Sequence, residues 1–87
     1  DYSDVYDYNY YVVNNRDVLA VYGLDENAVL KHFVTYGMKE GRQGKANFNV
    51  KNYKARYIDL QNVYGNNYTQ YYIHYIKYGK AEGRNGK

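Results

Sequence analysis

The sequence lacks cysteine, proline and tryptophan altogether, and its 87 residues fit one small domain. Without cysteine, neither a disulfide nor a cysteine-bound metal can stabilise the fold. A domain of this size buries only about 60 to 65% of the surface that its unfolded chain exposes. Its stability must therefore come from helix packing and aromatic surface, and little room is left for an enclosed active site.

Long apolar runs and dense charge are missing as well. No run approaches the roughly 20 apolar residues of a membrane-spanning helix, and no signal peptide is visible. The net charge is only +3, and the basic residues are scattered rather than gathered in one stripe. We therefore expect neither membrane insertion nor nucleic-acid binding. The abrupt start in a stretch rich in aspartate and tyrosine is typical of a segment of a longer protein.

Tyrosine is the residue in excess, with 15 copies against two of phenylalanine. A shift of 42 positions aligns the chain with itself without a gap, so that residues 6–45 (the first unit) overlay residues 48–87 (the second unit). Thirteen aligned pairs are identical, and they include all eight glycines and both histidines. Such a period is typical of stacked units that cannot bury their apolar faces alone. The sequence predicts one module, residues 1–87, with two internal repeats.

The apolar spacing within each unit is helical. Val29 and Phe33 share one helix face in the first unit, and Tyr71 and Tyr75 take the same positions in the second. We expect three short helices per unit, an all-α fold of six helices in one small bundle, because the alternation that strands need is absent. The expected caps and ends follow from residue type: Asp25 and Asn67 before the long helix, Asp17 and Asp59 before a shorter one, and Gly37 and Gly79 as helix ends.

No set of residues indicates catalysis. The only serine, Ser3, lies near the start of the sequence, so a Ser-His-Asp set cannot be assembled, and the glycines follow no phosphate-loop pattern. His32 and His74 have no further ligands at metal-site spacing, so we interpret both as partly buried, hydrogen-bonded residues. We interpret Glu40-Gly41-Arg42, and its counterpart in the second unit, as a turn that ties its loop to the next unit. The sequence therefore predicts no enzyme, no cofactor and no metal.

The repeat also indicates candidate binding residues. A position that is apolar in one unit and polar in the other is expected to face solvent, so its apolar member is exposed for another reason. Two alternatives stay open: the two units pack differently, or the residues meet a neighbouring module. The candidates for a protein-binding face, four of them in the second unit, are Tyr10, Tyr57, Ile58, Tyr68 and Ile73.

The motif of each unit resembles a known group of repeats. Tyr10-Tyr11, Tyr22-Gly23 and the run from His32 to Arg42 resemble the Tyr-rich tandem repeats of gut clostridial (Lachnospiraceae-type) surface proteins, and the second unit resembles them too. These repeats are similar to the immunoglobulin-binding domains of B-cell superantigens from gut commensal bacteria. The resemblance implies a secreted or cell-wall-attached protein and an all-helical module, but transfers no binding residue to this chain.

Two functions from different classes follow. The first is a monomeric, non-catalytic module of a multi-module surface protein that binds a host immunoglobulin variable domain, since aromatic residues often supply interface hot spots. The second is a cell-wall or glycan anchor that stacks tyrosines on sugar rings. Two observations weigh against the anchor: tryptophan is absent, and the spare tyrosines cluster in one unit instead of repeating. A purely structural spacer is the third option.

Overall fold

The computed structural model describes all 87 residues, and its regular structure is helical. The predicted all-α class and small helical bundle are confirmed. In chain order the elements are α1 (Tyr8–Asn14), α2 (Arg16–Tyr22), α3 (Glu26–His32), the π-helical segment η1 (Phe33–Gly37), α4 (Met38–Glu40), α5 (Val50–Arg56), α6 (Ile58–Tyr64), α7 (Tyr68–His74) and the π-helical segment η2 (Tyr75–Gly79). The elements α5, α6, α7 and η2 each begin 42 positions after α1, α2, α3 and η1.

In the first unit the longest helix passes through Gly37, the glycine at which we expected it to end. Helix α3 continues through η1 and α4, and the chain leaves it at Gly41, whose φ of 76° is left-handed. The corresponding turn of the second unit contains Gly83 with a φ of 75°. The prediction that Gly37 ends the first long helix is therefore wrong, since Gly37 itself is helical and α4 follows it, whereas η2 does end at Gly79.

Gly37 and Gly79 are required for close packing instead. A Cβ atom on Gly37 would overlap the hydroxyl of Tyr11, and one on Gly79 would overlap the hydroxyl of Tyr53. Both tyrosines are fully buried. Each unit therefore lets a tyrosine from its first helix cross directly over the backbone of its longest helix.

The predicted caps are correct in part. The Asp25 carboxylate accepts a hydrogen bond from the backbone N–H of Ala28 at 3.1 Å and caps α3, whereas Asn67 makes no such bond at α7. Asp17 and Asp59 do not cap α2 and α6, because each lies inside the first turn of its helix. This position leaves both carboxylates free to receive an arginine from elsewhere in the unit.

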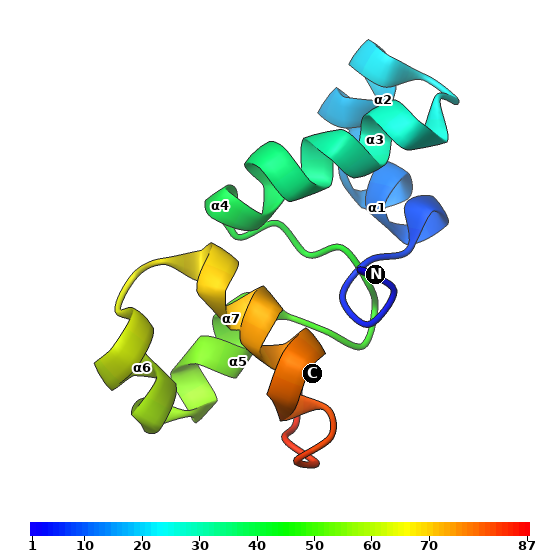
Figure 1. Cartoon of the computed structure of the whole chain (residues 1–87). Coiled ribbons are helices and arrows are strands. Elements are labelled where there is room, and N and C mark those ends of the chain that lie inside the picture. Colours follow the sequence, from blue (N-terminus) through cyan, green and yellow to red (C-terminus); the bar gives the residue numbers. More distant parts are fainter.

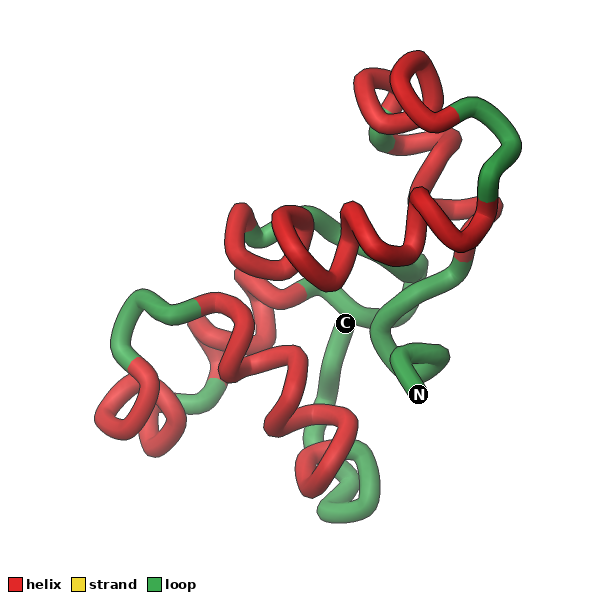
Figure 2. Tube along the Cα trace, turned by 45° about the horizontal axis from the view of Figure 1, so that its top comes forward, coloured by secondary structure: helices red, strands yellow, loops and turns green.

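The helices form two groups joined by the loop between α4 and α5, and the molecule is elongated, 38 by 22 by 18 Å (Figure 1). Helices α1 to α4 form one group and α5 to α7 the other, an arrangement that is also visible in the turned view (Figure 2). The core extends through both groups and is mostly aromatic and β-branched. Its buried members are Val5, Tyr11, Val12, Val18, Val29, Phe33, Met38, Phe48, Val50, Tyr53, Leu60, Tyr71 and Tyr72.

The two groups meet where α4 packs against α7. Tyr72 is fully buried at this joint, its ring stands edge-on to Phe33 at a centroid distance of 5.6 Å, and its hydroxyl donates a hydrogen bond to the carbonyl of Arg42. An ion pair of 2.7 Å between Asp4 and Lys80 adds a polar contact between the two groups. The exposed pair contributes little, so the buried tyrosine is the main contact of the joint.

Tyr6 holds the one buried side-chain polar atom without a hydrogen-bond partner, its hydroxyl oxygen. Its aligned counterpart in the second unit is Phe48, which has no hydroxyl. Burial raises the pKa of Tyr6 to about 12, in keeping with a hydroxyl held away from water.

We predict that Tyr6→Phe raises the free energy of unfolding by about 1 kcal/mol, because it removes an unpaired buried hydroxyl at constant packing. Urea unfolding followed by circular dichroism measures the change. Tyr11→Phe is the matched control, because its hydroxyl is hydrogen-bonded to His32. The free energy of unfolding of that control should instead fall by about 1 kcal/mol. A destabilised Tyr6→Phe variant would contradict this interpretation of the core.

Candidate binding site

Tyr57 is not a free surface residue. Its ring packs on Tyr53 in a T-shaped arrangement at 5.2 Å, and the guanidinium of Arg84 lies 4.7 Å above it. Its hydroxyl accepts a hydrogen bond from the backbone N–H of Asn85 at 2.6 Å. The expectation that Tyr57 is exposed is therefore wrong, because the side chain anchors the C-terminal segment to α5.

Tyr68 and Ile73 are also partly buried against the core. Tyr68 covers Gly41 at the joint between the units and lies under the ammonium group of Lys54, 5.3 Å from the ring centre. The expectation of exposure fails here too. Tyr68 is aromatic where its counterpart Glu26 is charged because only the second unit has a neighbour at this position. The two units therefore pack differently here, which is one of the alternatives that the sequence left open.

Ile58 and Tyr10 complete the predicted set. Ile58 is 71% exposed at the start of α6, as expected, and Tyr10 is half-buried on α1. Helices α1 and α6 lie in different groups, at opposite ends of the molecule in both views (Figures 1 and 2). The structure therefore does not bring the five residues together on one face. Their assignment as binding residues stays a prediction, and Ile58 is its best-exposed member.

The Glu and Arg side chains of these turns bind within their own unit, and not to the next one as we expected, although the backbone of the first turn contacts Tyr72 and Tyr68 of the second unit. Arg42 donates two hydrogen bonds to the Asp17 carboxylate, at 2.9 and 2.7 Å, and one to Glu40 at 2.8 Å. Arg84 binds Asp59 and Glu82 in the same way. The hydrogen bonds from Arg42 lower the pKa of Asp17 to about 2. These groups are occupied with one another, which fits a structural role for the turn.

The histidines are hydrogen-bonded to buried tyrosines, which confirms that part of the prediction. The Tyr11 hydroxyl lies 2.9 Å from His32 Nδ1, and the Tyr53 hydroxyl lies 2.8 Å from His74 Nδ1. Burial raises the pKa of both tyrosines and lowers the pKa of both histidines. We infer that each tyrosine stays protonated and that its hydroxyl donates a hydrogen bond to Nδ1. The imidazole is then neutral and carries its own proton on Nε2.

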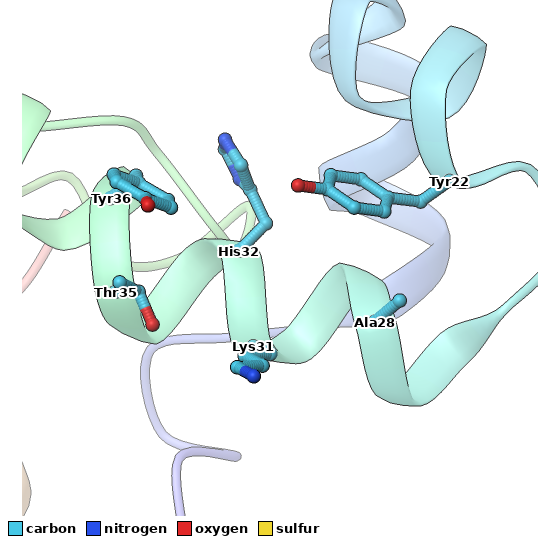
Figure 3. Close-up of a pocket in the computed structure, with 6 residues that line it drawn as sticks. All are labelled: Tyr22, Ala28, Lys31, His32, Thr35 and Tyr36. Atoms are coloured by element: carbon cyan, nitrogen blue, oxygen red, sulfur yellow. The ribbon is translucent and has the colours of Figure 1, made fainter.

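The molecule has one pocket, of about 380 Å³, beside His32 on the outer face of α3 and η1. The His32 ring lies between two tyrosines, 5.9 Å from the Tyr22 ring and 5.8 Å from the Tyr36 ring, and the three are tilted to one another by 50° and 39° (Figure 3). Tyr36 is 52% exposed. The lining residues are Tyr22, Ala28, Lys31, His32, Thr35 and Tyr36.

The same three aromatic residues recur in the second unit. His74 lies 6.2 Å from Tyr64 and 5.8 Å from Tyr78. The other lining positions differ, with Gln70, Ile73 and Lys77 in place of Ala28, Lys31 and Thr35, and no pocket is found there. Our sequence reasoning missed this trio, although its three members are identical in the two units.

A second exposed feature is aliphatic. On α6, Ile58 and Val63 are 71% and 72% exposed, and Asp59 and Asn62 are also exposed, whereas Leu60 is buried. On α2, Val21 is 73% exposed, and Leu24 after it is 85% exposed. The core does not use these side chains, so both outlying helices present apolar surface to water.

No protein-family model, curated protein or solved structure matches the chain. No helix combines the length and the apolar character needed to cross a membrane. No three histidine, cysteine, aspartate or glutamate side chains lie together as metal ligands would. The arrangement offers binding surfaces of two kinds: the aromatic trio and the exposed aliphatic residues.

We predict that the protein loses stability as the pH falls below about 6.5, the ordinary pKa of histidine. The folded state depresses the pKa of His32 and His74, so the unfolded state binds protons first and is favoured. Urea midpoints at pH 7.5 and pH 5.0 measure the loss. The carboxylates cannot account for it, because the depressed pKa of Asp17 matters only below its ordinary value of 3.8. An equally large loss in the His32→Gln/His74→Gln variant would contradict the assignment.

Proposed function

We propose that the chain is a non-catalytic binding module of a bacterial surface protein, and that its partner is a host immunoglobulin variable domain. The observation that supports a protein-binding role is the exposure of two apolar side chains on α6. Ile58 and Val63 remain more than two-thirds exposed although the chain has few large aliphatic residues to stabilise its core. The partner class follows from the resemblance to the immunoglobulin-binding repeats.

The short outlying helix suits this role. Leu60 fixes α6 to the core from its inner side, so Ile58 and Val63 project from a supported element. Asp59 lies between the two in sequence, and its bond to Arg84 helps to hold the helix in place. A helix that is already rigid loses little conformational entropy when a partner binds. Asn62 and Asp59 are exposed beside the two apolar side chains, so polar groups surround each of them.

A second candidate function, a cell-wall or glycan anchor, gains support from the aromatic trio. We expected a sugar site to repeat in both units. The clustering of the spare tyrosines in one unit therefore counted against the anchor function. Tyr57 and Tyr68 are now occupied in packing, whereas the trio of Tyr22, His32 and Tyr36 recurs. A trio in each unit would allow binding to a polymer by avidity, although only the first trio lines a pocket.

We predict that Ile58→Ser/Val63→Ser weakens binding to antibody Fab fragments about tenfold or more, since truncation at an interface centre commonly costs over 1 kcal/mol. Surface plasmon resonance with immobilised Fab measures it. Val21→Ser is the matched control, because Val21 is equally exposed at the aligned position of α2. Tyr57→Ala and Tyr68→Ala are poor tests, since both would disturb packing.

Unchanged Fab binding by Ile58→Ser/Val63→Ser, with a loss in Val21→Ser, would place the contact elsewhere and contradict the α6 assignment. No Fab binding by the intact chain, together with retention on purified peptidoglycan, would overturn the immunoglobulin proposal in favour of the anchor.

A further inference from the structure

The pocket beside His32 contains groups that the fold leaves unused. The ammonium group of Lys31 forms no ion pair or hydrogen bond within the chain, and Lys31 is exposed at the pocket. The Nδ1 atom of His32 is occupied by Tyr11, so its Nε2 atom is the one available for a ligand. The Thr35 side chain adds a hydroxyl to the lining. Aromatic walls with a few polar groups are the usual composition of a small-molecule site.

The shape and charge of the pocket select among ligands that contact aromatic rings. The tilts of 50° and 39° between successive rings leave no parallel slot for a flat base, so the rings suit a puckered ring better. A quaternary ammonium ligand of the kind held in aromatic cages would be repelled by Lys31. A nucleotide chain would need further cations for its phosphates, and Lys31 is the only cation in the lining.

We propose that this pocket binds a sugar ring that carries a carboxylate. The ring stacks on Tyr36 and Tyr22, the Nε2–H of His32 donates a hydrogen bond to a ring substituent, and Lys31 pairs with the carboxylate. This inference rests on the anchor function, the second candidate above, and adds the ligand class and the residues. It assigns the acid preference to the first unit alone, because the trio of the second unit lines no pocket and Ile73 replaces Lys31 there, with a lysine only at the position of Thr35.

The chemistry has two sources, bacterial wall sugars and host glycans, and the test separates them. Binding of N-acetylmuramic acid, N-acetylglucosamine and N-acetylneuraminic acid to the full chain is measured by ¹H–¹⁵N chemical-shift titration. The first two differ by the 3-O-lactyl ether, which carries the carboxylate. We expect N-acetylmuramic acid to bind about fivefold more tightly than N-acetylglucosamine, as one partly exposed ion pair allows, with shifts around Lys31 and Tyr36. Tighter binding of N-acetylneuraminic acid would support the same site and indicate the host source.

Variants test the individual residues. Lys31→Gln should abolish the preference for the acidic sugar, and Tyr36→Ala should weaken both amino sugars. Tyr78→Ala is the matched control from the second unit and should keep the preference. Tyr36 and Tyr78 are 52% and 58% exposed, so neither change should disturb the fold, as circular dichroism can verify.

Three results would overturn the proposal: equal binding of the two amino sugars, no effect of Lys31→Gln, or tighter binding of uridine monophosphate than of any sugar. Its failure is distinguishable from failure of the anchor function. If Lys31→Gln and Tyr36→Ala are retained on purified peptidoglycan as well as the parent, the anchor stands and this pocket is not its site.

Discussion

The structure depends on one contact made twice: a buried tyrosine that crosses over a helical glycine to reach a histidine. In the first unit Tyr11 passes over Gly37 to His32, and in the second Tyr53 passes over Gly79 to His74. A chain this small, without disulfides, has few ways to hold short helices together. The contact combines a fully buried ring with a satisfied hydroxyl, so it supplies area without leaving a polar atom unpaired.

This contact also accounts for the surface of the protein. Because Nδ1 of each histidine is occupied by a tyrosine, the imidazole is held in place between two further tyrosines, half-buried at His32 and buried at His74. The fold therefore produces an aromatic trio in each unit as a consequence of its own packing. The polar neighbours decide what that trio can do, and only the first unit combines it with Lys31 and a pocket.

Much of the fold could be predicted from the sequence, because helix periodicity and residue type determine it locally. The all-helical class, the Asp25 cap and the hydrogen-bonded histidines agree with those expectations. The end at Gly37 was predicted wrongly because a glycine can serve a left-handed turn or a close approach, and sequence does not distinguish them. The close approach at Gly37 can be recognised only from the position of the Tyr11 ring in the structure.

The binding face was less predictable, for a related reason. Comparison of aligned positions assumes that both units have the same surroundings, but Tyr68 faces the joint where Glu26 faces water. Tyr57 was taken as spare because nothing in the sequence places Arg84 and Asn85 against it. Ile58 is exposed as expected, because no other part of the chain covers this side chain.

The central claim, that a tyrosine hydroxyl donates to each histidine, is tested most directly by the ¹⁵N chemical shifts of the imidazole nitrogens at neutral pH. The account predicts that both His32 and His74 show one fixed tautomer with the proton on Nε2, and that both titrate below the ordinary histidine range. Rapidly averaged tautomers with an unperturbed titration would contradict it.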